Sequence, residues 1–328
     1  MNVLVTGGLG FIGHRVVQRL ESLGHLVAVI DNRTNYGIIP QDQIDYLINE
    51  RTKYFNRERI FVYGADAADI TNSVGLNNIF NIDLPDVVIH LASYPRQKVV
   101  NANPAYGSRV MSEGLLNLLE TCVNYEVRKF VYVSSSMVYG DFNEQVTEDA
   151  ICQPRGQYGI MKLAGEWLVK DYSRRDNMVH TIIRPSAVYG PNDVEDRVIA
   201  KFMLAAMRNE TLKVNGANEA LDFTYVDDAA NGIVAAALSD NTENKIYNVT
   251  RSRSRTLLEA AELIVKIAGR GNIEVLDKDN NFPSRGSLNI DAARKDFEYD
   301  PKIDIEEGFQ KYYQWLTTTG HWAFKKHD

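Results

Sequence analysis

The stretch VLVTGGLGFIG, residues 3–13, decides the fold of this chain because it joins three signals. Its apolar start predicts a buried strand, the glycines Gly7, Gly10 and Gly13 predict a tight turn, and the apolar periodicity that follows predicts a helix. Glycines in such a turn let the backbone approach a pyrophosphate, whose charge the N–H groups of the helix N-terminus attract. The stretch therefore predicts a strand–helix unit that binds a dinucleotide.

An acidic residue stands where such a unit needs one. Asp31 ends the next apolar run, 18 residues after Gly13. A carboxylate at this place accepts hydrogen bonds from the adenosine ribose hydroxyls and repels a 2′-phosphate. We therefore expect NAD as the cofactor, with the nearby Arg33 as the one feature that favours NADP.

Outward from this unit, the first half of the chain alternates short apolar runs with helical patterns. Such runs occur at 27–30, 60–62, 87–89 and 130–133. Strands that are apolar on both faces and separated by helices are typical of a parallel sheet covered on two sides. We predict an α/β fold with a doubly wound parallel sheet of the Rossmann kind.

The second half of the chain has a different sequence pattern. Beyond Arg184 the alternation loosens, and loops rich in Pro, Gly and Asn become longer. We predict that this part is a smaller, irregular C-terminal α/β domain that binds the substrate. The predicted limits are 1–183 for the NAD-binding domain and 184–328 for the substrate domain, with the chain returning to the first domain around 222–240.

Composition and charge exclude several classes of protein. The 328 residues are 45% hydrophobic and 24% charged, which is typical of globular domains. The net charge of -7 provides no global field to hold a nucleic-acid polymer or an anionic membrane. There is no apolar run of about 18 residues, only two cysteines, and no histidine spacing typical of metal ligands, and we expect no secretion leader. We expect a cytoplasmic protein without a metal site.

Six further motifs follow the glycine turn in order. They are GADAAD at 64–69, HLAS at 90–93, VSSSMVYG at 133–140, YGIMK at 158–162, RPSAVYGP at 184–191 and DFTYVDD at 222–228. In this combination the sequence resembles the extended short-chain dehydrogenases/reductases, specifically the group of NAD-dependent nucleotide-sugar epimerases and dehydratases. The resemblance covers essentially the whole chain.

The resemblance implies a set of cofactor contacts. Asp66 and Ala67 would lie at the edge of the adenine, and Leu91 and Ala92 would line the cofactor. The expected NAD contacts are Gly7, Gly10, Phe11, Ile12, Gly13, Asp31, Asn32, Asp66, Ala67, Leu91, Ala92, Ser134, Tyr158, Lys162 and Pro185.

The resemblance also implies that Ser135, Tyr158 and Lys162 are catalytic. Tyr158 and Lys162 are four residues apart on an expected helix and therefore share one face. The ammonium would stabilise a phenolate and lower the tyrosine pKa from its usual value of about 10, which makes Tyr158 a usable base. Ser135 would hydrogen-bond the same reacting hydroxyl. Outside this context, a Tyr-x-x-x-Lys pair is usually only a surface pair.

The residues after Ser135 narrow the reaction. Relatives that eliminate water carry an Asp-Glu pair there, and those that epimerise at C3 and C5 carry a cysteine at the second place. This chain has Ser136 and Met137, which we expect to contact substrate but which cannot move a proton at carbon. What remains is hydride transfer at one carbinol, as in a 4-epimerase of a nucleotide-activated sugar with a transient 4-keto intermediate. The alternative is an oxidoreductase of a keto sugar or small alcohol on the same fold.

The contact with the substrate diphosphate departs from the family pattern. The arginine that usually precedes the Asp-Phe pair is Leu221 here. Arg285, in a Ser-Arg-Gly turn, is the expected replacement, because a guanidinium suits bidentate contact with phosphate oxygens. Arg96, Lys98 and the basic run 251–255 are the alternatives, although such a run is most simply a solvated loop. The identities of the nucleotide and the sugar stay open.

The resemblance implies one partner besides the nucleotide-sugar, namely a second copy of the chain. In the family, the helices that correspond to 115–123 and 162–172 pair across a two-fold axis. Trp167 and Leu168 belong to an apolar stripe in the second stretch, which fits either such a face or the core.

Overall fold

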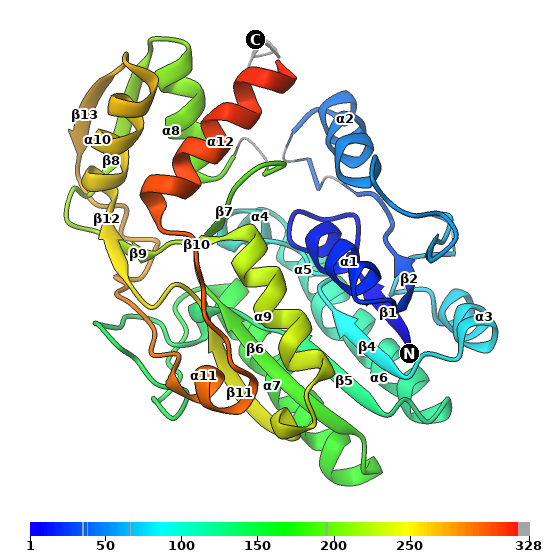
Figure 1. Cartoon of the computed structure of the whole chain (residues 1–328). Coiled ribbons are helices and arrows are strands. Elements are labelled where there is room, and N and C mark those ends of the chain that lie inside the picture. Colours follow the sequence, from blue (N-terminus) through cyan, green and yellow to red (C-terminus); the bar gives the residue numbers. More distant parts are fainter. Residues whose placement is uncertain (35, 38, 66, 194–195, 321–328) are drawn as a thin grey trace.

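The computed structural model of the chain describes residues 1–320 apart from 35, 38, 66, 194 and 195. A parallel sheet of seven strands forms its centre, with helices on both faces (Figure 1). In spatial order the strands are β11 (Lys245–Val249), β6 (Val179–Pro185), β5 (Lys129–Val133), β4 (Val87–His90), β1 (Asn2–Thr6), β2 (Leu26–Ile30) and β3 (Ile60–Val62). The prediction of a doubly wound parallel sheet is confirmed.

The order of the strands reverses at β1. The register places Val5 opposite Val29 of β2 on one side and opposite Ile89 of β4 on the other, so the three strands end at the same level. The loop after β1 leads to a helix on one face of the sheet, and the loop after β4 leads to a helix on the other face. In sheets of this type, ligands bind in the crevice that such a reversal opens at the carboxyl ends of the strands.

Helices cover the sheet in two layers (Figure 1). Within the described residues, no helix combines the length and the apolar character needed to span a lipid bilayer. One layer holds α1 (Gly13–Ser22), α2 (Gln41–Thr52), α9 (Val226–Leu238) and α11 (Asp291–Phe297), and the other holds α3 (Ser73–Asp83), α4 (Gln97–Ala102), α5 (Pro104–Ser108), a π-helical turn (Arg109–Glu113), α6 (Gly114–Asn124) and α7 (Gln157–Asp176).

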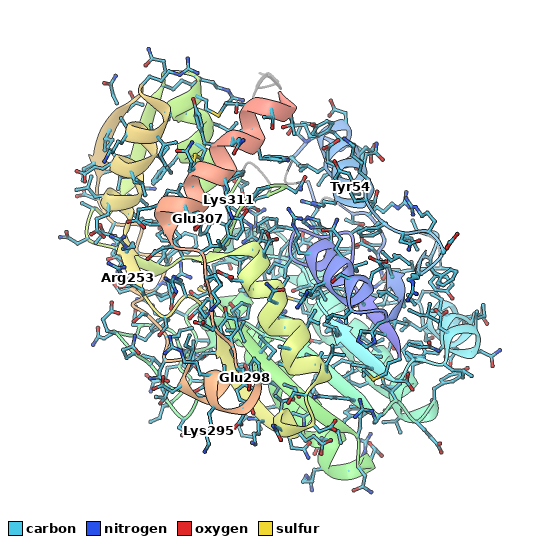
Figure 2. The ribbon with its side chains drawn as sticks, viewed as in Figure 1. Tyr54, Arg253, Lys295, Glu298, Glu307 and Lys311 are labelled. Atoms are coloured by element: carbon cyan, nitrogen blue, oxygen red, sulfur yellow. The ribbon has the colours of Figure 1, made fainter. Side chains whose placement is uncertain are left out.

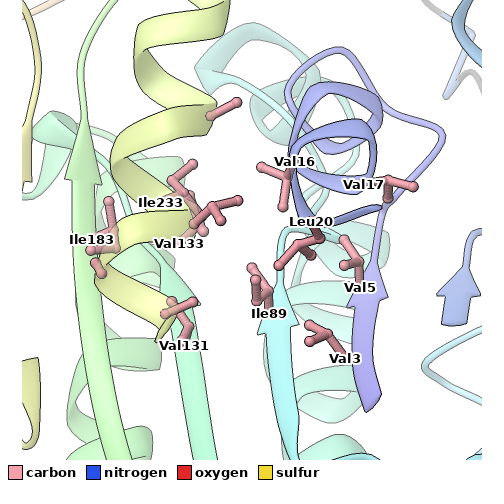
Figure 3. Packing of buried hydrophobic residues seen from close by; sticks show 14 of the residues in the cluster. Val3, Val5, Val16, Val17, Leu20, Ile89, Val131, Val133, Ile183 and Ile233 are labelled. Atoms are coloured by element: carbon pink, nitrogen blue, oxygen red, sulfur yellow. The ribbon is translucent and has the colours of Figure 1, made fainter. Parts of the chain in front are cut away.

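Hydrophobic side chains fill the space between the sheet and each layer. Val3 of β1 belongs to the same buried cluster as Leu20 of α1 and Ile233 of α9 (Figure 3). The next residue, Leu4, belongs to the cluster beneath α3, α6 and α7. Because successive side chains of a strand point to opposite faces, a strand covered on both sides must be apolar throughout. This is why the apolar runs in the sequence predicted the strands.

A smaller part of the molecule, residues 186–225 and 250–285 with the last helix, lies beyond the carboxyl ends of the central strands (Figure 1). It has a hydrophobic cluster of its own, with Tyr189, Phe223 and Phe309 among its members. The presence of a smaller α/β part is confirmed, whereas the boundary after residue 183 stays a prediction. Its elements are three strand pairs, β7 (Val188–Tyr189) with β10 (Thr224–Tyr225), β8 (Thr211–Asn215) with β13 (Asn272–Leu276) and β9 (Ala220–Asp222) with β12 (Ser254–Thr256), and the helices α8 (Val198–Met207), α10 (Leu257–Ala268) and α12 (Ile305–Thr319).

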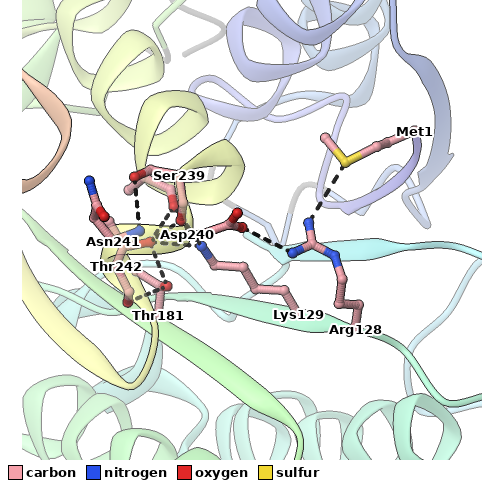
Figure 4. Close-up of polar contacts among 9 residues, drawn as sticks. Met1, Arg128, Lys129, Thr181, Ser239, Asp240, Asn241 and Thr242 are labelled. Atoms are coloured by element: carbon pink, nitrogen blue, oxygen red, sulfur yellow. Dashed lines mark hydrogen bonds and ion pairs between the residues drawn. The ribbon is translucent and has the colours of Figure 1, made fainter.

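A buried lysine anchors the helix that brings the chain back to the sheet. Lys129, at the start of β5, donates from Nζ to the carbonyl oxygens of Ala236 (2.9 Å) and Ser239 (2.7 Å) and to Thr242 Oγ1 (2.7 Å) (Figure 4). The last carbonyl groups of a helix lack partners within the helix, so the ammonium caps the C-terminal end of α9. The cap holds α9 against the sheet, where β11 then pairs with β6.

Candidate active site

A cavity of about 1270 Å³ lies at the carboxyl ends of the central strands and extends beneath the smaller part of the molecule. The loops after β1, β2, β4 and β5 line one side, and residues of α8, β9 and the segment 278–285 line the other. Single-ligand sites in proteins usually measure about 300–1,000 Å³. The volume therefore suits two ligands held next to each other.

The glycine turn shapes the floor of the cavity. Gly7 has a φ of +71°, and a Cβ atom there would lie 2.7 Å from the backbone N of Ala92. A Cβ atom at Gly13 would lie 2.0 Å from the carbonyl oxygen of Gly7. Only glycine fits at either position. The turn brings the N-terminal end of α1 to the cavity, where the positive end of the helix dipole can attract an anion.

Asp31 lines the cavity at the end of β2. Its carboxylate accepts hydrogen bonds from the backbone N–H groups of Leu9 (3.0 Å) and Arg33 (2.9 Å). Burial raises the pKa of Asp31, while these two N–H groups and the guanidinium of Arg51 lower it. Arg33 lines the cavity too, and it meets Asp31 through its backbone N–H while its side chain is exposed.

Most of the predicted cofactor contacts line this cavity. The exceptions are Asp66, which lies outside the described residues, and Ala67, which does not line it although its neighbours Ala68 and Asp69 do. The Asp69 carboxylate accepts a hydrogen bond of 3.0 Å from Asn32 Nδ2. The sequence analysis did not single out Asp69, even though it is the second acid of the motif at 64–69.

Ser135, Tyr158 and Lys162 line the cavity together, and we refer to them as the catalytic group. Tyr158 and Lys162 lie on the first turns of α7, whereas Ser135 follows β5 and caps a 3₁₀ turn by accepting a hydrogen bond from the N–H of Met137 (3.2 Å). Ser136 and Met137 line the cavity as well. The fold therefore brings the three residues predicted to be catalytic and both flanking residues to one wall.

A buried ion pair supports the catalytic group from below. Glu166 accepts hydrogen bonds from Arg184 Nε (2.9 Å) and Nη2 (2.6 Å), and from Ser134 Oγ (2.6 Å). Lys162 donates to the carbonyl oxygen of Val133 (2.8 Å), and burial lowers the pKa of Lys162 to about 8 while Glu166 raises it. The sequence analysis missed Glu166, although its position four residues after Lys162 was visible.

The electrostatic surroundings of Tyr158 differ from the expectation. Burial raises the pKa of its phenol, and the groups that lower this pKa are Arg197, a hydrogen bond with Ser135, and Arg96. Lys162 was expected to have this effect, but its Nζ is engaged with a backbone carbonyl. Sequence analysis named Arg96 only as a phosphate ligand and did not name Arg197, which has no local motif to mark it.

The wall formed by the smaller part carries a second set of charged residues, Glu219, Lys278 and Arg285, which we call the loop group. Lys278 Nζ lies 3.0 Å from Glu219 Oε1. Burial lowers the pKa of Arg285 to about 10, and Glu219 raises it. Arg285 Nε is shielded from solvent and has no hydrogen-bond partner within the described residues, while Leu221 adds only apolar surface to the same wall.

The other residues considered as ligands of the diphosphate differ in whether they line the cavity. Arg96 and Lys98 line the cavity. The basic run 251–255 does not, although all its residues are described. Arg253 lies beside β12 on the flank of the molecule and pairs with Asp304 at 3.1 Å (Figure 2). The run therefore lies outside the candidate site.

Comparison with known proteins agrees with this geometry. Residues 3–250 match the model of the NAD dependent epimerase/dehydratase family. The chain is 28% identical over 326 residues to a protein of Bacillus subtilis (strain 168) described as the uncharacterized UDP-glucose epimerase YtcB, covering 97% of this chain and 98% of that protein.

Two solved structures have the same fold over nearly the whole chain. The UDP-glucuronic acid 4-epimerase from Bacillus cereus, in complex with UDP-glucuronic acid and NAD, has a TM-score of 0.88 and 26% identity, covering 97% of this chain and 100% of that chain. The UDP-N-acetylglucosamine 4-epimerase from Methanobrevibacter ruminantium M1, in complex with UDP-N-acetylmuramic acid, has a TM-score of 0.85 and 26% identity, covering 97% and 98%.

Proposed function

The chain belongs to the NAD-dependent epimerase/dehydratase family, and on that premise we propose that it interconverts the two C4 epimers of a UDP-sugar through a transient 4-keto intermediate. The observation that carries the proposal is that the glycine turn and the catalytic group open into one cavity. Hydride and proton must leave the same carbinol, so their acceptors must meet at one place. The reaction has no net redox change, which makes the enzyme an isomerase.

The residues on the sheet side of the cavity fit NAD. The glycine turn leaves a cradle that any Cβ atom would fill, beside the N-terminal end of α1. Asp31 presents its carboxylate where the adenosine ribose hydroxyls need an acceptor. NAD bound there supplies the site that takes the hydride from C4 and returns it.

The catalytic group moves the proton. Tyr158, as a phenolate, takes the proton from the C4 hydroxyl, and the Ser135 hydroxyl holds the same oxygen in place. Burial raises the pKa of Tyr158, and Arg197, a hydrogen bond with Ser135 and Arg96 oppose this rise and so favour the phenolate. When the 4-keto sugar is reduced on its other face, Tyr158 gives the proton back. Met137 offers no acid or base for elimination.

The loop group holds the diphosphate in this proposal. Arg285 Nε is a buried donor without a partner among the described residues, and a guanidinium matches the geometry of phosphate oxygens. A substrate held at its diphosphate can turn its sugar within the cavity, which the return of hydride to the opposite face requires. Arg285 thus takes the role of the arginine that relatives carry at the position of Leu221.

The test is a panel of UDP-glucose, UDP-N-acetylglucosamine and UDP-glucuronate, each followed by NMR of the sugar ring protons. We expect one of them to convert to its C4 epimer, with NAD retained by the purified protein and no accumulation of NADH at 340 nm. Net formation of NADH or of a stable keto sugar would contradict the proposal and favour the oxidoreductase alternative.

We further propose that the enzyme is a homodimer built through α6 and α7. Trp167 and Ile160 of α7 expose 64% and 52% of their surfaces, which is unusual for such large apolar side chains. We expect Trp167→Glu to convert a dimer to a monomer in analytical ultracentrifugation. The matched control is Tyr54→Glu, since Tyr54 is even more exposed, at 76%, but lies by α2 (Figure 2). A wild-type monomer would overturn the proposal.

We also propose a reducing compartment, the cytoplasm, as the place of action. Cys122 and Cys152 are the only cysteines of the chain, and both are free thiols. Cys122 is fully buried in the cluster beneath α6 and α7, and burial raises the pKa of its thiol. Disulfides are rare where thiols are kept reduced. Mass spectrometry of protein isolated with an alkylating agent should find both thiols reduced.

A further inference from the structure

Arg96 adopts a backbone conformation that is costly for any residue except glycine. It precedes α4 with φ 71° and ψ 146°, outside the left-handed helical region that Leu84 and Asn177 adopt at helix ends. L-residues almost never occupy this region, and the strain they store there is concentrated at functional sites. Because glycine would avoid this strain, we infer that the side chain of Arg96 has a function in the cavity.

The start of α7, which packs against α4, shows what the fold itself prefers there. Gly156 precedes α7 with φ 85° and ψ 158°, nearly the same conformation as Arg96. Gln97 joins the two turns, because its Oε1 accepts a hydrogen bond from the N–H of Tyr158 (3.2 Å) and its side chain fills the space above Gly156. Glycine occupies one turn and arginine the other, although both have the same backbone requirement.

The side chain of Arg96 is held in the cavity with unused donors. Its Nη1 lies 2.8 Å from Asp196, and its Nη2 is shielded from solvent without a hydrogen-bond partner in the described residues. Asp196 also pairs with Lys201 at 3.0 Å, so one carboxylate is shared between two cations. A guanidinium carries five N–H donors, and Arg96 therefore keeps a face available for another anion.

Arg197 adds a second guanidinium to the same wall. Its Nε lies 2.9 Å from Asp193, and its guanidinium lies over the ring of Phe11 at 5.3 Å from the ring centre. Both Arg197 and Arg96 line the cavity, and both act on the ionisation of Tyr158. The ion pairs with Asp193 and Asp196 fix where the two guanidinium groups point, and we call these two residues the arginine pair.

Resting on the proposed function, we propose that the sugar of the substrate carries a carboxylate on a position next to C4, and that the arginine pair binds it. The diphosphate is attached at C1, across the ring from C4, and belongs with Arg285 on the other wall. C3 and C5 are the neighbours of C4, so a group on either of them lies beside Tyr158 when C4 reacts. A hexuronate places its carboxylate on C5, and a muramic acid places one on the oxygen of C3.

Calorimetry tests the proposal without depending on turnover. We compare the affinities of UDP-glucuronate, UDP-N-acetylmuramate, UDP-glucose and UDP for the NAD-containing protein and for Arg96→Gly, Arg197→Gln and the control Arg174→Gln, which lies on the exposed face of α7. We expect one acidic nucleotide-sugar to bind at least about tenfold more tightly than UDP-glucose, because charge-assisted hydrogen bonds are the strong ones. The tighter of the two acids tells whether the carboxylate sits on C5 or on O3.

The variants distinguish a carboxylate contact from other roles of the arginine pair. Arg96→Gly should lose most of the preference for the acid and keep or raise the melting temperature, because glycine relieves the backbone strain. Arg197→Gln should also lose the preference, and Arg174→Gln should keep it. Affinity for UDP should change less than about twofold in all three. A lower melting temperature with the preference intact would show a structural role and overturn the proposal.

Two further outcomes would overturn it. Equal affinity of the wild type for UDP-glucose and both acids is one, and a parallel loss of UDP affinity in Arg96→Gly, which would place the guanidinium on the diphosphate, is the other. NMR on the same samples separates this proposal from the proposed function. If neutral sugars are epimerised and the acids do not bind more tightly, the proposed 4-epimerase activity stands and the proposed carboxylate contact is refuted. If an acid binds more tightly but no sugar is epimerised, the carboxylate contact stands and the 4-epimerase activity is refuted.

Discussion

The catalytic group and the loop group face the same cavity but are held there by different kinds of structure. The catalytic group stands at the end of β5 and on the first turns of α7, above the buried pair of Glu166 and Arg184. Arg285 lies in an irregular segment that meets β9 through an isolated bridge to Ala220. The residues proposed to move the proton thus rest on regular elements, whereas the residue proposed to bind the diphosphate lies in an irregular segment.

Tyr158→Phe should have the largest effect on activity, because it removes the proton-moving group from the rigid side of the cavity. We expect kcat to fall about 10²–10⁴-fold, because the variant keeps the ring but lacks the group that moves the proton. The bound NAD, measured by absorbance after denaturation, should equal that of the wild type. Tyr172→Phe, further along the same helix and outside the cavity-lining residues, is the control. Turnover of Tyr158→Phe at the wild-type rate would remove this tyrosine from the mechanism.

Glu166→Gln tests whether the support below the catalytic group is as rigid as the comparison requires. The substitution leaves the buried Arg184 without its counter-charge and should lower the free energy of unfolding by about 3–5 kcal/mol. Asp171→Asn breaks an exposed pair with Arg174 on the same helix and should cost at most about 1 kcal/mol. Urea denaturation measures both. Equal effects would mean that the buried pair is no more important to stability than a surface pair.

Arg285→Ala probes the loop group. We expect KM for the nucleotide-sugar to rise by a factor corresponding to about 1.5–3 kcal/mol, because an ionised hydrogen-bond partner is lost. The effect on kcat should be smaller, since the diphosphate is bound alike in the ground and transition states. Arg253→Ala, on the flank of the smaller part, should leave both constants unchanged (Figure 2). If KM stays the same in Arg285→Ala, the diphosphate is held by other residues, Lys98 first.

The pH dependence of kcat/KM is the last of the four tests. Lys162 has a pKa of about 8, so it is an ammonium below this pH and neutral above it. If the ammonium assists the phenolate of Tyr158, kcat/KM falls as the pH rises through 8, about tenfold per unit beyond it. The measurement covers pH 6.5 to 10 with NAD content checked at each end. A flat profile across this range would mean that Arg197 and Arg96, and not Lys162, stabilise the phenolate of Tyr158.

Local sequence features predicted a large part of this molecule. Apolar runs such as 27–30 and 130–133 correspond to strands, because a strand buried on both faces must be apolar at every position. The glycines of the opening turn follow from contacts within one short segment. The spacing of Tyr158 and Lys162 follows from the helix period. In each case the physical requirement involves residues close together along the chain.

The parts that were missed depend on contacts between distant segments. Arg197 and Arg96 belong to segments that precede α8 and α4, and neither segment carries a pattern that points to Tyr158. Sequence analysis could not foresee that Lys162 Nζ also donates a hydrogen bond to the carbonyl oxygen of Val133. The unusual backbone of Arg96 was invisible too, because an arginine in a sequence indicates no positive φ.

The sequence by itself therefore determined the fold class and the glycine cradle, and it predicted that Asp31 and the residues of the catalytic group would lie at one site, as they do. Each of these follows from short-range sterics, strand and helix periodicity, or the spacing of a motif. Only the tertiary structure decided which cations face Tyr158, which arginine keeps free donors for an anion, and that Glu166 and Arg184 close a buried pair beneath the site. Charges act through space, and the spatial neighbours of a charge are set when the sheet brings remote segments to one edge.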